Sequence, residues 1–154
     1  MAILNGTAYV VKLGDTAGSE VLFADQTEGS ISMNMETRDI TTKSSSGYRQ
    51  LLGGLRSASL SFSGLVDSTL TAEGDLAFLM DHITGHATAA DARQPTNVVF
   101  GFDAGTDTTA NDSLFSGEAL ITSIEVSAGT EDNVTVSATL EFTGEITYAD
   151  DAGA

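Results

Sequence analysis

Strict alternation of apolar and polar residues near the end of the chain constrains the fold most. Across residues 134–146 the even positions are apolar or glycine, and the odd positions are Thr, Ser or Glu. A β-strand points successive side chains to opposite faces, so this stretch predicts a long strand with one buried and one wet face. Residues 57–66 and 30–36 alternate in the same way, with mainly small polar side chains on the polar side. The pattern predicts antiparallel β-structure.

One segment departs from the period of two and predicts a helix over residues 71–84. The apolar residues at the i, i+3, i+4 and i+7 spacing of a core-facing helix are Leu76, Leu79, Met80 and Ile83. Thr71 at the start is a suitable N-cap. Strands with a shorter or weaker alternation are predicted at residues 7–13, 20–23, 97–103 and 114–127. The chain therefore predicts a mainly β, α+β fold in a single domain over residues 1–154, with the helix over a sheet edge or an open end of a sandwich.

Composition narrows the function classes. A chain of 154 residues with 41% hydrophobic residues can bury a core without a disulfide or metal, and it has no cysteine. The 22 acidic side chains against 6 basic ones give a formal net charge of −16, whereas nucleic-acid and anionic-membrane binders need a basic face. The N-terminus lacks the basic and apolar segments of a signal peptide, and no apolar run approaches the length of a transmembrane helix. We therefore expect no membrane binding.

Two polar stretches are predicted as long loops, and they differ in charge. The first covers residues 37–56 and holds four of the six basic side chains, namely Arg38, Lys43, Arg49 and Arg56. The second covers residues 103–112 and is acidic and rich in turn-forming residues. The concentration of positive charge sets the first loop apart from an otherwise acidic chain.

No set of residues predicts catalysis. His82 and His86 stand four apart beside Asp81, a spacing that on a continuous helix lets two imidazoles share a metal. Gly85 is expected to end the helix between them, so we expect a surface helix end instead. Residues 103–112 lack the residue order of a calcium-binding loop, and the chain has no Gly-x-Ser-x-Gly motif or phosphate-binding glycine loop. We therefore expect no enzyme activity, no metal and no cofactor.

The most specific pattern lies between residues 35 and 66. It contains the series ETRDITTK (36–43) and GYR (47–49), then the serine-alternating SASLSFSG (57–64). This pattern resembles the major tail tube proteins of long, non-contractile-tailed bacteriophages and of related gene transfer particles. The order of the predicted elements, including ITSIE (121–125) before the last long strand, extends the likeness over most of the chain.

The resemblance implies a subunit of two packed antiparallel β-sheets with one flanking helix. Such subunits form rings, usually of six copies, that stack into a hollow tube through which viral DNA enters the host. The implied location is the tail of the virion, after assembly in the cytoplasm of the host bacterium. The implied partners are further copies of the chain, tail tip and tail terminator proteins, and a tape measure protein inside the lumen. DNA would pass without specific binding.

The resemblance also implies roles for individual residues. Small polar or acidic side chains on the wet strand faces would line the lumen, where carboxylates repel DNA phosphates. The lumen-lining candidates are Asn34, Glu36, Ser57, Ser59, Ser61, Ser63, Thr139, Glu141 and Glu145. The charged and aromatic residues of the first loop would contact the next ring or subunit. These candidates are Arg38, Asp39, Lys43, Tyr48, Arg49 and Arg56.

A ligand-binding β-sandwich, of a carbohydrate-binding or cation-dependent adhesin type, is the main alternative. Its cation would sit in residues 103–112. The chain has no tryptophan and only 6% aromatic residues, which such modules use as binding platforms, so the composition disfavours this alternative. An enzyme is the remaining alternative.

Overall fold

The computed structural model describes residues 6, 9–15, 20–23, 25–66, 76–84, 95–102 and 113–149. Its elements in chain order are β1 (Tyr9–Gly14), β2 (Val21–Leu22), β3 (Asp25–Asp39), β4 (Leu51–Leu65), α1 (Leu76–Thr84), β5 (Thr96–Phe102), β6 (Ser113–Ser127) and β7 (Thr135–Ala149). The mainly β fold with one helix agrees with the prediction in this part of the chain. The first five residues of the predicted helix, 71–75, lie outside the described residues, as do residues 103–112.

The strands form one antiparallel sheet in the order β2-β1-β5-β6-β7-β4-β3, and not the two packed sheets that we expected. The single sheet arises because β6 and β7 are 15 residues long and take part in both halves. Register shifts at Ser116/Glu118 and Ile121/Ser123 interrupt their pairing, and such bulges bend strands. The bent sheet brings its two ends together, since the Gln26 side chain of β3 hydrogen-bonds both the N–H and the carbonyl of Val11 in β1.

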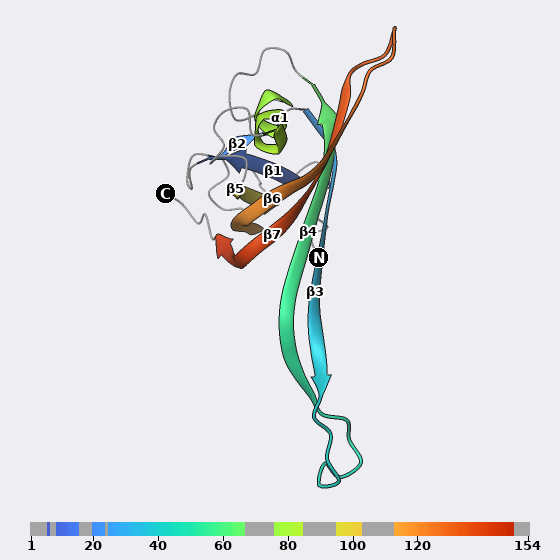
Figure 1. Cartoon of the computed structure of the whole chain (residues 1–154), viewed down its shortest axis with the longest axis vertical. Coiled ribbons are helices and arrows are strands. Elements are labelled where there is room, and N and C mark those ends of the chain that lie inside the picture. The colour runs from blue at the N-terminus through green and yellow to red at the C-terminus, as the bar shows by residue number, and fades with distance from the viewer. Residues whose placement is uncertain are drawn as a thin grey trace.

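The hydrophobic core lies inside this curled sheet and under α1 (Figure 1). Its fully buried residues come from β1, β4, β5, β6, β7 and the helix, and include Val11, Leu13, Leu60, Leu79, Val98, Ala119, Val136 and Leu140. Burying a Val or Leu side chain stabilises the fold by about 1.5–3 kcal/mol. The apolar residues predicted from the alternation in β4 and β7 are therefore part of this core, while α1 packs mainly on β6.

Half of the predicted helix stripe faces the core, since Leu79 is fully buried and Leu76 packs against the core cluster. Phe78 and Leu79 are buried, while Met80 and Ile83 are 42% and 43% exposed. His82 is on the buried side, where its ring packs against Phe78 and its Nε2 lies 3.4 Å from Oδ1 of Asp15. These aromatic and polar contacts rotate the helix away from its purely aliphatic stripe. Among the residues described, no helix is long and apolar enough to cross a membrane.

The predicted loop over residues 37–56 is wrong at both ends. β3 continues to Asp39 and β4 begins at Leu51, so only residues 40–50 are outside the strands. The two strands form an arm, defined here as residues 33–58, that projects from the rest of the subunit (Figure 1). A register shift between Met35 and Thr37 breaks the alternation there, which hid the strands from the sequence pattern.

Candidate functional site

A continuous polar surface runs across β3, β4 and β7. Residues directly opposite each other on neighbouring antiparallel strands point to the same face. Ser30 pairs with Ser61, which pairs with Thr139, and the Ser30 and Ser61 hydroxyls lie 2.8 Å apart. Equivalent rows complete this surface, the serine face, which extends onto β6 because Ser123 pairs with Thr139 and Glu125 pairs with Ser137. Its members are Glu28, Ser30, Ser32, Asn34, Ser57, Ser59, Ser61, Ser63, Ser123, Glu125, Ser137, Thr139 and Glu141.

The structure brings most of the predicted lining residues together on the serine face. Glu36 is on β3 at the register shift between Met35 and Thr37, where the alternation is interrupted, so the strand pairing does not assign it to the serine face. Glu145 is separate, because it follows Gly144, whose φ of 87° interrupts the alternation of β7. The sequence reasoning did not select Glu28, since a register shift between Gln26 and Glu28 hides its place in the strand pattern.

The opposite face of the same strands is closed by the subunit itself. Leu60 and Leu140 are directly opposite each other on β4 and β7, and both are fully buried. Phe62 and Ala138 form the next pair and are also buried. The serine face is therefore the side of this sheet that the subunit itself does not cover.

The four strands behind the serine face have two open edges. Pairing between β5 and β6 stops at Ala119, so residues 120–127 of β6 pair only with β7. At the other end of the order, β3 beyond Gln26 pairs only with β4 among the described strands. Each open edge presents unpaired backbone N–H and C=O groups, which makes it a template for pairing with another strand.

The tip of the arm is an ordered turn. Ile40 N–H donates to the Gln50 carbonyl at 3.0 Å, and Tyr48 N–H donates to the Ser45 carbonyl at 2.9 Å. Arg49 Nε lies 3.0 Å from Oδ2 of Asp39. Hydrogen bonds from Thr41, together with Arg49, hold the pKa of the exposed Asp39 carboxyl below its ordinary value.

Five of the six predicted contact residues lie at this tip or next to it. The Tyr48 side chain is 78% exposed, although its backbone is held in the turn. Arg38 and Lys43 are exposed and make no ion pair with any residue that the structure describes. Arg56 is the exception, because it lies further back on β4, opposite Met35. The tip therefore presents an aromatic ring and positive charge to whatever it meets.

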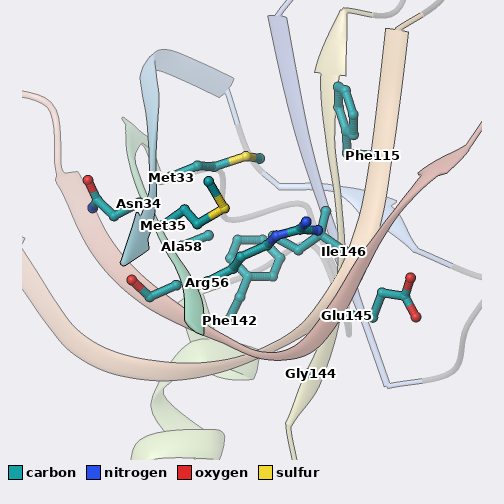
Figure 2. Close-up of a pocket in the computed structure, with 11 residues that line it drawn as sticks. Met33, Asn34, Met35, Arg56, Ala58, Phe115, Phe142, Gly144, Glu145 and Ile146 are labelled. Atoms are coloured by element: carbon teal, nitrogen blue, oxygen red, sulfur yellow. The ribbon is translucent and has the colours of Figure 1, made fainter. Parts of the chain in front are cut away.

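Arg56 belongs to an apolar notch that the sequence analysis did not predict. The arm leaves β7 at Ser59, and between the arm and the second half of β7 lies a cavity of about 400 Å³. Its walls, drawn in Figure 2, include Met33, Met35, Arg56, Phe115, Phe142 and Ile146. We call this cavity the notch. The residues of its two walls are far apart in the sequence, so no local pattern predicts it.

The two metal-binding alternatives weighed from the sequence, at His82 and His86 and at residues 103–112, find no further ligands among the described residues. No group of three or more His, Asp or Glu side chains that could hold a metal is found among them. His86 and residues 103–112 lie outside the described part of the chain.

The chain is similar in structure to several tail proteins. It matches the tail of an empty gene transfer agent (GTA) particle, refined with C6 symmetry, with a TM-score of 0.70 and 25% identity over 96% of this chain and 99% of that one. The SPP1 tail tube matches with a TM-score of 0.68 and 16% identity over 97% and 82%. The tube-terminating cap of the anti-feeding prophage matches with a TM-score of 0.64 and 17% identity over 97% and 93%. For the SPP1 and anti-feeding prophage proteins, at 16% and 17% identity, the likeness shows the fold alone.

A search of curated protein sequences returned no match. The family model for the phage tail tube protein matches residues 3–148, which is nearly the whole chain. The serine face, the open edges and the arm thus occur in a sequence that fits this model from end to end. The chain belongs to the phage tail tube protein family, whose members are structural proteins of the virion tail.

Proposed function

We propose that this protein is the repeating subunit of a tail tube, forming closed rings that stack into a hollow conduit for DNA. The observation that carries the proposal is the four-stranded segment β6-β7-β4-β3, which has the polar serine face on its uncovered side and an open strand edge at each end. A free monomer with two such edges is prone to uncontrolled pairing. Closure into a barrel of several copies removes both edges at once.

Ring closure joins two different edges. The open edge of β3 in one copy pairs with residues 120–127 of β6 in the next, so the contact is head-to-tail. Head-to-tail contacts generate a ring when the rotation between copies closes. The C6 symmetry of the similar GTA tail supports six copies per ring.

The serine face then lines the lumen. Its hydroxyls are polar but uncharged, and Glu28 and Glu141 add carboxylates. At physiological salt the Debye length is about 8 Å, so only carboxylates on the lining itself repel a passing DNA molecule. The lumen therefore gives DNA no basic surface on which to stop, and DNA passes without specific binding.

The arm tip connects rings. Arg38, Lys43 and Tyr48 are exposed at the end of a projection, where positive charge can meet the acidic surface of a neighbouring ring. Aromatic residues and arginine are also common anchors of protein interfaces. At its two ends the tube would meet tail tip and terminator proteins, and a tape measure protein would occupy the lumen during assembly. These partners fit the similarity to a tube-terminating cap.

Negative-stain electron microscopy of the purified protein, with light scattering for the mass in solution, tests the proposal. We expect rings or hollow tubes, either spontaneously or after addition of a tail tip complex. A protein that stays monomeric in both conditions would refute the proposed function.

Charge reversal at the arm tip provides a second test. The variant Arg38→Glu with Lys43→Glu is expected to fold and form rings but to stop stacking. The control, Asp81→Lys, reverses the charge of one exposed side chain on α1, away from the tip, and should leave stacking intact. Full-length tubes from the tip variant would reject the role of the arm.

A further inference from the structure

The notch combines an apolar lining with one basic side chain, Arg56, and one carboxylate, Glu145, which Figure 2 shows directed away from the Arg56 guanidinium. Met33 and Met35 on the arm wall are 52% and 51% exposed, which is unusual for large apolar side chains on paired strands. Figure 2 shows the Arg56 side chain reaching across the cavity toward Ile146 on the opposite wall. Arg56 makes no ion pair with any described residue. The notch therefore suits an occupant that brings carboxylates on a small apolar or neutral loop.

The turn between β6 and β7 has the complementary chemistry. Residues 128–134 are all exposed and include Glu131 and Asp132 with no basic side chain. A weak backbone contact, from Asp132 N–H to the Gly129 carbonyl at 3.5 Å, holds the turn. Figure 1 shows this turn at one end of the long axis of the subunit and the arm at the other.

We infer that the notch receives the β6–β7 turn of a subunit in the adjacent ring, with Arg56 paired to Glu131 and Asp132. The inference rests on the proposed tube, because it needs rings stacked end to end. A second copy is the occupant that charge complementarity favours, since the chain carries only 6 basic residues against 22 acidic ones. The two surfaces are different patches, the turn at one end of the subunit and the notch at the base of the arm, and such head-to-tail contacts build open filaments instead of closed dimers.

A charge-swap experiment tests the pairing. Arg56→Glu is expected to leave the melting temperature and the rings unchanged while the fraction of protein in sedimenting tubes falls about tenfold or more, because like charges then face each other. Glu131→Lys with Asp132→Lys should give the same defect. Combining all three substitutions should restore tubes to within about threefold of the wild type.

The control for the swap is Asp81→Lys, which adds positive charge on the exposed side of α1, away from the turn, the serine face and the open strand edges. Combined with Arg56→Glu, it is expected to give no recovery. Tubes of normal length from Arg56→Glu alone would overturn the inference. Failure of the triple variant to exceed Arg56→Glu would overturn it too.

Disulfide trapping supplies a second readout, since the chain has no native cysteine. Glu145→Cys places a thiol at the notch and Thr130→Cys places one on the turn. Under oxidation, tubes made from a mixture of the two variants should yield a cross-linked dimer, and tubes made from either variant alone should not. If the wild-type protein forms tubes but the mixture of the two variants gives no cross-linked dimer, the docking is overturned and the proposed function still stands. A wild-type protein that forms no tubes would refute both.

Discussion

Truncation of Leu140 measures how strongly the inner face of the curled sheet holds the subunit together. The side chain is 0% exposed and lies opposite Leu60 on β4 and Ile121 on β6. Leu→Ala at such a site removes buried methyl groups and leaves a cavity, at a cost of 2–5 kcal/mol, and we expect about 3 kcal/mol here. For a chain of this length each kcal/mol lowers the melting temperature by about 2–4 °C. Leu140→Ala should therefore melt about 9 °C below the wild type.

Thermal unfolding followed by circular dichroism is the assay, under conditions where the protein does not assemble. The matched control is Thr139→Ala, the neighbouring position on the serine face. The hydrogen bond from Thr122 goes to the Thr139 carbonyl, so the control keeps it and should lose less than about 0.5 kcal/mol. If the melting temperature falls by a similar amount in both variants, or by less than about 2 °C in Leu140→Ala, the buried and exposed faces of the sheet have been assigned incorrectly.

Three further predictions follow from single positions. Gly144 has a φ of 87°, so Gly144→Ala should destabilise the subunit by about 1–2 kcal/mol in the same melting assay, and an unchanged stability would mean that β7 does not need this bend. The pKa of Asp39 is lowered in the folded state, so its contribution to the arm tip is complete above the unfolded-state pKa and is lost as pH falls through the lowered folded-state value; the protection factor of the Thr41 amide, which is its hydrogen-exchange rate corrected for the intrinsic rate at each pH, should fall over that acidic range, and Asp39→Asn should remove the pH dependence. Tubes with Ser61→Lys should retain short duplex DNA on a filter at low salt and release it as salt rises, whereas wild-type tubes should retain none at either salt.

The strands themselves were largely predictable from the sequence, because alternation depends only on which residues face the core. The residues facing the core in β4 and β7 are those that the pattern selected, and the serine face follows from the same parity. The number of sheets was not predictable. Alternation predicts which face of the sheet each side chain is on. Whether the strands form one sheet or two depends on bulges in β6 and β7 that bend both strands.

The arm and the notch were missed for different reasons. In the arm, the bulge near Met35 and the run Leu51 to Leu55 have no clear period of two, so the segment resembled a loop. The notch depends on side chains more than 80 positions apart, such as Arg56 and Phe142, that only the fold brings together. The basic residues of the tip were found because their charge contrasts with the rest of the chain.

The continuity of β6 and β7 has a mechanical consequence for a tube. Both strands pass from the serine-faced segment into the part that pairs with β5 without an intervening loop. In the proposed tube, the inner wall and the outer body would therefore be coupled by covalent chain and by a hydrogen-bonded ladder, with no loop between them. Any widening of the lumen under the pressure of a passing molecule would then have to bend the sheet at its bulges. For such a tube we expect bending to be concentrated at the two register shifts, Ser116/Glu118 and Ile121/Ser123.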